Sequence, residues 1–216
     1  MDFFYSIIGF FASGGAFMYP ILLVFAVGVA IATERYITLT LVTNKNQAVW
    51  DKVQSLLANG EFEAAHDLTT GDESTIAQVL NMGLSLQGAV RRREDIEIAM
   101  EESMMEIVPR LEKRTPYVAL ASSIATLLGL LGTIMGLIQA FTAVANANPA
   151  EKADLLSASI SVAMNTTAFG LMVAIPLLVV HAVLTSKTGD IVDSLEMATV
   201  KALNVFSKRA KRIVEA

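Results

Sequence analysis

Apolar and polar positions divide this chain of 216 residues into long apolar runs separated by polar segments. Three runs contain no Asp, Glu, Lys or Arg, namely Phe3–Thr33, Tyr117–Ala150 and Leu155–Ser186. Each run exceeds the roughly 20 residues that an α-helix needs to cross the hydrocarbon core of a bilayer. The pattern therefore predicts an all-α integral membrane protein with three transmembrane helices.

The ends of these runs and the return of charged residues set the expected boundaries. The predicted segments, in chain order, are an amphipathic N-terminal helix over 1–16, span one over 17–41, a helical cytoplasmic domain over 42–115, span two over 116–144, a short outer turn over 145–154, span three over 155–186 and a cytoplasmic C-terminal helix over 187–216.

The distribution of Lys and Arg predicts the orientation. None precedes Arg35, and Lys152 alone lies between spans two and three, whereas the middle segment and the tail hold the others. Because basic residues concentrate on the cytoplasmic side, the N-terminus is expected outside and the tail inside. The missing basic residues at the start also argue against a cleaved signal peptide.

The cytoplasmic segment shows helical spacing of apolar residues throughout. One helix is expected to stop at Gly60, and a shorter one follows over 61–71. A third helix begins at a Ser74 or Thr75 cap and stops at Gly88.

A long helix then starts near Arg93 and runs into span two, with kinks predicted at Pro109 and Pro116. One stripe of this helix favours core packing over a methionine-rich groove for a partner, and its members are Met100, Met104, Ile107 and Leu111. A similar stripe in the tail predicts bundling with copies of the same chain, through Ile191, Leu195, Ala198, Ala202 and Val205.

The amino-acid composition excludes several classes of protein and of binding site. The chain is 54% hydrophobic and 17% charged, against about a quarter charged in soluble domains. It has no cysteine, which excludes disulfides and thiolate metal sites. A net charge of −5 argues against nucleic-acid binding. The sequence also contains no motif for a cofactor, a metal or an enzyme's catalytic set, so we predict a protein that is not an enzyme.

Polar and small residues inside spans two and three are the candidate functional residues. In span two, Gly129, Gly132 and Gly136 form one smooth face that another helix can approach closely, and Thr133 lies beside that face. Span three carries a polar cluster followed by small residues and a proline: Asn165, Thr166, Thr167, Gly170 and Pro176.

A structural role is the simpler interpretation of any single hydroxyl, which can bond a carbonyl of its own helix. Asn165 differs, because its amide needs a neighbouring helix or water. Neither span contains a carboxylate. The cluster therefore predicts a lined cavity whose charge comes from another chain, and three spans need self-association to enclose it.

Three stretches carry a family resemblance: GGAFMYPILLVF, LLGLLGTIMGLIQAF and NTTAFGLMVAIP. In them the chain resembles the ExbB/TolQ/MotA family of ion-driven motor subunits, and its length and topology are closest to the ExbB/TolQ branch. The resemblance implies a homopentamer in the bacterial inner membrane. It surrounds a dimer of single-span ExbD/TolR-like partners whose membrane aspartate carries the ion.

The same resemblance places the family's pore threonines at Thr133 and Thr167, with Thr166 and Asn165 as further polar contacts. The implied client is TonB/TolA-like or another periplasmic protein, and membrane lipid surrounds the assembly. In one departure, Val162 stands where many relatives have glutamate. Proton and sodium remain alternative ions.

The preferred hypothesis is thus an ion channel and motor subunit that couples an ion gradient to mechanical work. Two alternatives stay open. A self-sufficient channel or transporter would need a charge within its own spans, and none is there. A membrane scaffold would use the polar cluster only to pack helices.

Overall fold

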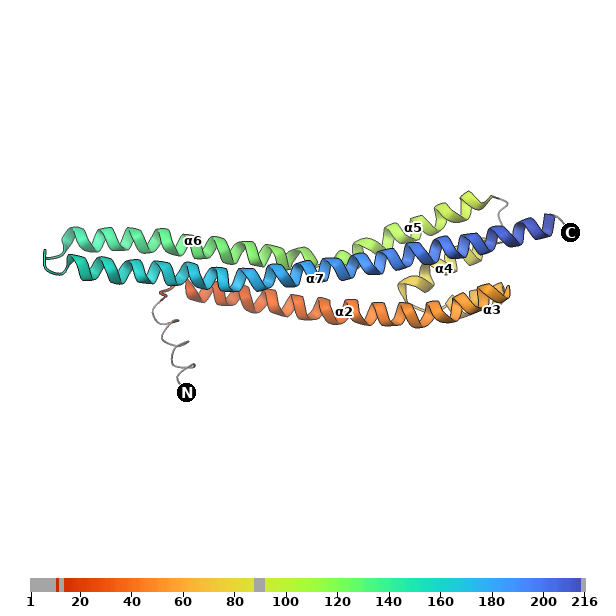
Figure 1. Cartoon of the computed structure of the whole chain (residues 1–216), viewed down its shortest axis with the longest axis horizontal. Helices are drawn as coiled ribbons and strands as arrows, with labels where there is room; N and C mark the ends of the chain where they lie inside the picture. Colours follow the sequence, from red (N-terminus) through yellow and green to blue (C-terminus); the bar gives the residue numbers. More distant parts are fainter. Residues whose placement is uncertain (1–10, 12–13, 88–91, 215–216) are drawn as a thin grey trace, which may run out of the picture. The chain divides into compact units, whose positions relative to one another are not determined.

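The computed structural model describes residue 11, residues 14–87 and residues 92–214. The elements in this part of the chain are all α-helices, which confirms the all-α prediction (Figure 1). They are α2 (Met18–Asn59), α3 (Phe62–Thr69), α4 (Thr75–Leu86), α5 (Arg93–Glu112), α6 (Thr115–Asn146) and α7 (Lys152–Val214). The predicted N-terminal amphipathic helix lies almost wholly outside the described residues, as does the expected stop at Gly88.

Three helical stretches are long and apolar enough to cross a membrane, in agreement with the three predicted spans. They lie within Met18–Asn59, Arg93–Ala145 and Lys152–Lys208. Only 22%, 33% and 28% of their apolar windows are buried within the chain. Lipid or other chains must therefore cover most of this apolar surface.

Two helices run on beyond the predicted spans. α2 joins the first span to the first helix of the segment predicted to be cytoplasmic, and α7 joins the third span to the tail. α2 ends at Asn59, where Gly60 adopts a φ of +82°. That left-handed conformation suits glycine, so the predicted stop at Gly60 is confirmed.

The predicted continuous helix from the cytoplasmic segment into span two is wrong. α5 ends at Glu112 and α6 begins at Thr115, and between them Arg114 has a φ of 71°. Pro116 explains the break. It has no N–H to bond the Glu112 carbonyl, and it is tolerated in the first turn of a new helix, where that donor is not needed.

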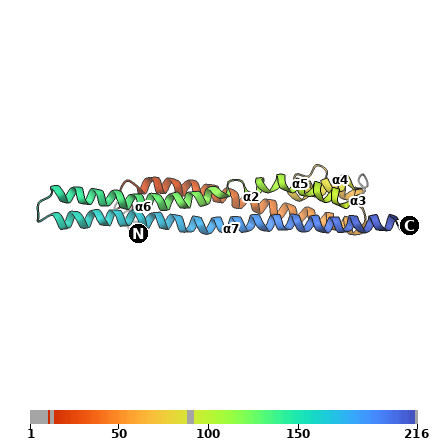
Figure 2. The ribbon, with the colours of Figure 1, turned by 90° about the horizontal axis from the view of Figure 1, so that it is seen from above.

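The membrane unit consists of the described residues of Met1–Glu34 and Arg114–Val183. Within it, α6 and the first part of α7 run antiparallel and side by side in both views (Figures 1 and 2). A short turn joins them, in which the Glu151 N–H donates to the Asn148 carbonyl at 3.0 Å.

The second unit is called the cytoplasmic unit after the segment that the sequence predicts on that side of the membrane. It consists of the described residues of Arg35–Lys113 and Leu184–Ala216. Its core is made of large apolar side chains that are almost completely buried: Leu39, Val53, Leu80, Met100, Ile107, Leu184, Ile191, Leu195 and Leu203. α4 packs against both α3 and α5. The burial of Met100, Ile107 and Leu111 confirms that the α5 stripe is core.

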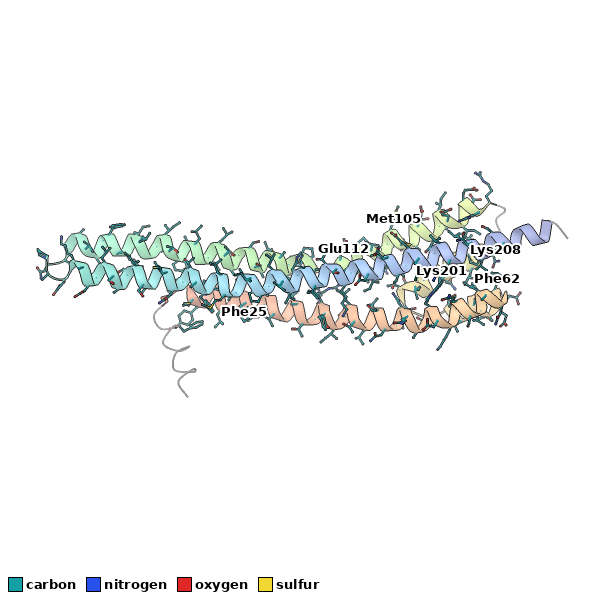
Figure 3. All side chains as sticks on the ribbon, viewed as in Figure 1. Phe25, Phe62, Met105, Glu112, Lys201 and Lys208 are labelled. Atoms are coloured by element: carbon teal, nitrogen blue, oxygen red, sulfur yellow. The ribbon has the colours of Figure 1, made fainter. Side chains whose placement is uncertain are left out.

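The predicted bundling of the tail with other copies is not the role of its apolar stripe. Ile191, Leu195, Ala198 and Ala202 are all buried within their own chain. The ring of Phe62, labelled in Figure 3, lies 5.9 Å from that of Phe206 between centroids. The helices of the cytoplasmic segment thus already cover this face of α7.

A polar link ties α2 to the start of α4. Asn46 is 3% exposed; its amide nitrogen donates to Thr75 Oγ1 at 2.7 Å, and its oxygen accepts the Ile76 N–H at 3.3 Å. The Ser74 hydroxyl accepts the Ala77 N–H at 3.3 Å, so Ser74, rather than Thr75, is the N-cap. A side chain of α2 therefore supplies part of the cap of α4.

Asp72 continues this link. Its carboxylate accepts the Ser74 N–H at 2.7 Å and lies 3.6 Å from Lys45 Nζ. The Ser74 backbone hydrogen bond is the main cause that lowers the pKa of Asp72, and the Ser74 hydroxyl and Lys45 lower it further, against the opposing effect of burial.

Candidate functional site: the α6–α7 pair

The contact between α6 and α7 brings backbone against backbone. A Cβ atom on Gly170 would lie 2.8 Å from the Ala125 carbonyl oxygen and 3.0 Å from Gly129 Cα. At Gly136 an added Cβ would lie 2.6 Å from Ala163 Cβ. Only glycine fits such positions, because backbone atoms cannot move aside as a side chain can. The glycines of both helices thus set the separation of the pair.

Thr133 and Thr167 meet at this contact. Their hydroxyl oxygens touch each other across the two helices. The Thr167 hydroxyl also donates to the Gly129 carbonyl at 2.8 Å, and Thr133 Oγ1 lies 3.3 Å from the same oxygen. Both side chains are half-buried. The structure therefore brings together the two threonines that the resemblance singled out.

The chemistry of this pair follows from its protons. Each hydroxyl has one donor and two acceptor lone pairs. The Gly129 carbonyl and the neighbouring hydroxyl can take up both protons. The remaining lone pairs can then accept a hydrogen bond or coordinate a cation, whereas they offer nothing to an anion. The pair is thus an acceptor site in a stretch without a formal charge of its own.

Thr166 contacts both Gly132 of α6 and Gly14 in the segment before α2. It is 2% exposed, and its methyl carbon Cγ2 would lie 2.4 Å from a Cβ atom on Gly132. Its hydroxyl is 2.6 Å from the Gly14 carbonyl and 2.9 Å from the Val162 carbonyl, to either of which it can donate. Thr166 therefore fastens the segment before α2 to the α6–α7 pair.

Two further predicted residues of span three are Asn165 and Pro176. Asn165 is half-buried on α7, and Pro176 is exposed within the same helix. Among the described residues, no three His, Cys, Asp or Glu side chains come together as a metal site would require.

Ser122 was missed in the sequence. Its buried hydroxyl donates to the Ala174 carbonyl at 2.7 Å, which adds a further hydrogen bond between α6 and α7. A signal was present, because Ser122 precedes Gly129 by seven residues and so lies on the glycine face of the same helix.

The sequence of this region also matches a family profile. The profile of the MotA/TolQ/ExbB proton channel family matches residues 72–197, more than half of the chain. The chain belongs to this family. The match covers the threonine pair, the glycine contact and much of the cytoplasmic unit, and with the three apolar helices it marks a multi-pass membrane protein.

Individual relatives agree with the family. An ExbB homolog of Methanothermobacter thermautotrophicus is 26% identical over 200 residues, which cover 91% of this chain and 69% of the relative. The ExbB-like 1 protein of Synechocystis is 30% identical over 184 residues, or 82% of this chain and 69% of the relative. The Tol-Pal system protein TolQ of Haemophilus influenzae is 36% identical over 78 residues, which cover 36% of this chain and 34% of the relative.

Proposed function

We propose that this protein is an ion-channel and motor subunit that couples a proton or sodium gradient to mechanical work across the cell envelope. In this proposal it lies in the inner membrane with its N-terminus outside. It forms a homo-oligomer, a pentamer by the family resemblance, around a dimer of single-span ExbD/TolR-like partners. The client is a TonB/TolA-like or other periplasmic protein.

The observation that carries the proposal is the hydroxyl pair Thr133–Thr167 in a stretch of membrane helix without charge. Hydroxyl lone pairs can coordinate a cation or accept a hydrogen bond from a protonated carboxyl group. A hydroxyl has no formal charge, however, so it does not itself carry the ion through the membrane. The acid that carries the ion therefore belongs to a partner chain in this proposal, and the two threonines line its path.

Within this proposal, Thr166 positions helices and does not line the pore. Thr166 points into the contact with Gly132 and the segment before α2, so its role here is to position the helices. The large apolar surface that the chain leaves uncovered supports self-association, since one chain buries a third or less of each apolar window.

The test is the double variant Thr133→Val with Thr167→Val, which keeps the shape of both side chains and removes both hydroxyls. We expect the complex to assemble as before and to lose gradient-driven ion uptake in proteoliposomes that contain the native partner. Thr142→Val is the matched control, because Thr142 is an exposed residue of α6 whose hydroxyl donates to the Ile138 carbonyl of its own helix at 2.8 Å.

Three outcomes separate the hypotheses. Full ion uptake by the double variant removes the two threonines from the pathway. Uptake by this chain without a partner would favour a self-sufficient channel, and no uptake with any partner would favour a scaffold.

A further inference from the structure

Lys187 is the first charged residue after the third apolar run, and the cytoplasmic unit holds it in a fixed position. Its ammonium group donates to Thr40 Oγ1 at 2.6 Å and lies 4.1 Å from the centroid of the Tyr36 ring. The Thr40 hydroxyl in turn donates to the Tyr36 carbonyl at 2.6 Å, which leaves its lone pair for the lysine. Two residues one turn apart on α2 thus both contact the ammonium group of Lys187.

This cation has no protein counter-charge in the part of the chain that the structure describes. No carboxylate there lies within 4.0 Å of Lys187 Nζ, and Asp190, three residues further along α7, forms no ion pair with it. An ammonium group has three N–H donors. Thr40 takes one and the aromatic ring covers one side, so a donor remains for an anion from outside the chain.

The surroundings of Lys187 are apolar and open. Tyr36 is 51% exposed, Ile37 53% and Leu41 63%. Tyr36 and Thr40 are four residues apart on one face of α2, and Ile37 and Leu41 are four apart on the adjacent face. Where an apolar run ends, this combination matches the boundary of a bilayer, which offers acyl chains, an aromatic zone and phosphate groups in that order.

We propose that Lys187, Thr40 and Tyr36 form a binding site for the phosphate of an anionic phospholipid, whose acyl chain lies along Ile37 and Leu41. Clusters of basic and polar groups on the cytoplasmic side of membrane helices bind such headgroups. A free phosphate ion would meet the same ammonium group but gain nothing from the two exposed apolar side chains. The lipid is therefore the expected source of the phosphate, and the site uses none of the residues proposed to line the ion pathway.

The test compares lipids on the purified full-length protein in detergent, by native mass spectrometry and thermal unfolding. The probes are phosphatidylglycerol, phosphatidylcholine and inorganic phosphate. We expect the protein to prefer phosphatidylglycerol over phosphatidylcholine by about fivefold, the contribution of one lysine at an anionic surface. Lys187→Gln should remove this preference, and inorganic phosphate should not compete for the site.

Lys201→Gln is the matched control. Lys201, labelled in Figure 3, also lies over an aromatic ring, with its ammonium 5.7 Å from the Trp50 centroid. It belongs to the same unit but comes fourteen residues beyond Lys187 on α7, in a charged part of the sequence. Its variant should keep the full lipid preference.

Thr40→Val is a second test that keeps the charge and removes the oxygen that positions it, and we expect it to weaken the preference by a smaller factor. An unchanged preference in Lys187→Gln, or in Thr40→Val should Lys187→Gln not fold, would overturn the proposal. So would competition by inorganic phosphate. If Lys187→Gln instead splits the oligomer and leaves lipid binding intact, the lysine pairs with a neighbouring copy and the lipid site is refuted.

Discussion

The two compact units of this chain pack their helices by opposite means. In the membrane unit, the α6–α7 contact consists of glycine, alanine and threonine, with the backbones in direct contact at Gly129 and Gly170. In the cytoplasmic unit, large side chains such as Leu80, Met100 and Leu195 fill the space between helices and are fully buried.

The difference reflects the solvent of each unit. In water, burial of apolar side chains stabilises a helix contact by about 25 cal/mol per Å². In lipid this gain is absent, because the surroundings are as apolar as leucine, and helices associate through close van der Waals contact and hydrogen bonds instead. The small residues and hydroxyl groups at the α6–α7 contact thus have a structural reason, and the same contact brings the two threonines together.

The largest effect should come from placing a side chain in the backbone contact. Gly170→Val would put a Cβ atom 2.8 Å from the Ala125 carbonyl, and neither backbone can yield. We expect a loss of more than about 4 kcal/mol, enough to prevent the α6–α7 pair from forming. The measurement is the fraction of monodisperse protein after detergent extraction.

Gly189→Ala on the same helix is the control. Outside the adjacent backbone of α7, no atom of the described residues lies within 4 Å of a Cβ placed there, so this change should leave the protein intact or stabilise it by up to about 1 kcal/mol. Normal yield of Gly170→Val would show that the backbone contact is not essential.

A smaller effect is expected from a cavity in the cytoplasmic core. Met100 is 0% exposed, and Met100→Ala should destabilise the cytoplasmic unit by about 2–5 kcal/mol. Met105, labelled in Figure 3, lies on the same helix but is 73% exposed, so Met105→Ala should change stability by no more than about 0.5 kcal/mol. Hydrogen exchange of the α4 and α5 amides measures the difference, and equal protection in both variants would contradict the assignment of Met100 to the core.

The smallest effect concerns pH. The pKa of Asp72 is lowered from 3.8 in the folded unit, so its carboxylate stabilises the fold above pH 3.8, and this contribution disappears as the pH falls through the folded-state value. Asp72→Asn should cost about 0.5 kcal/mol near neutral pH, and the difference from the parent protein should vanish in acid. Thermal unfolding over a pH series tests this. A difference that grows on acidification would have the wrong sign.

Much of this architecture could be predicted, because the strongest signals are local. Runs without charge predicted the three spans, and the glycine conformation at Gly60 marks the end of α2 as its position in the pattern indicated. The Met100 stripe was correctly assigned to the core for the same reason, since helical spacing decides which side chains share a face.

The predictions that failed, and the contacts that were missed, depend on which segments pack together. The pattern of residues along a single helix does not determine this. The apolar stripe around Leu195 predicted bundling with other copies of the chain, but it is buried within its own chain. Kinks were predicted at Pro109 and Pro116, but α5 continues past Pro109 to Glu112 and a new helix begins at Thr115. A proline that kinks a helix and one that starts a new helix look alike in sequence. In the site, Thr133 and Thr167 were singled out, whereas the contact of Thr166 with Gly14 needed coordinates, because the two are 152 residues apart. The pore role of the threonines stays a prediction.

The composition of the cytoplasmic unit from two separated parts of the chain has a consequence for biosynthesis. Leu195, Leu203 and Phe206 complete its core, and they are translated after the second and third spans. The apolar faces of α3, α4 and α5 therefore wait uncovered while the second and third spans enter the bilayer. During that interval a chaperone or the membrane surface must shield them, and a chain truncated before Leu195 would be a substrate for proteolysis even with every span inserted.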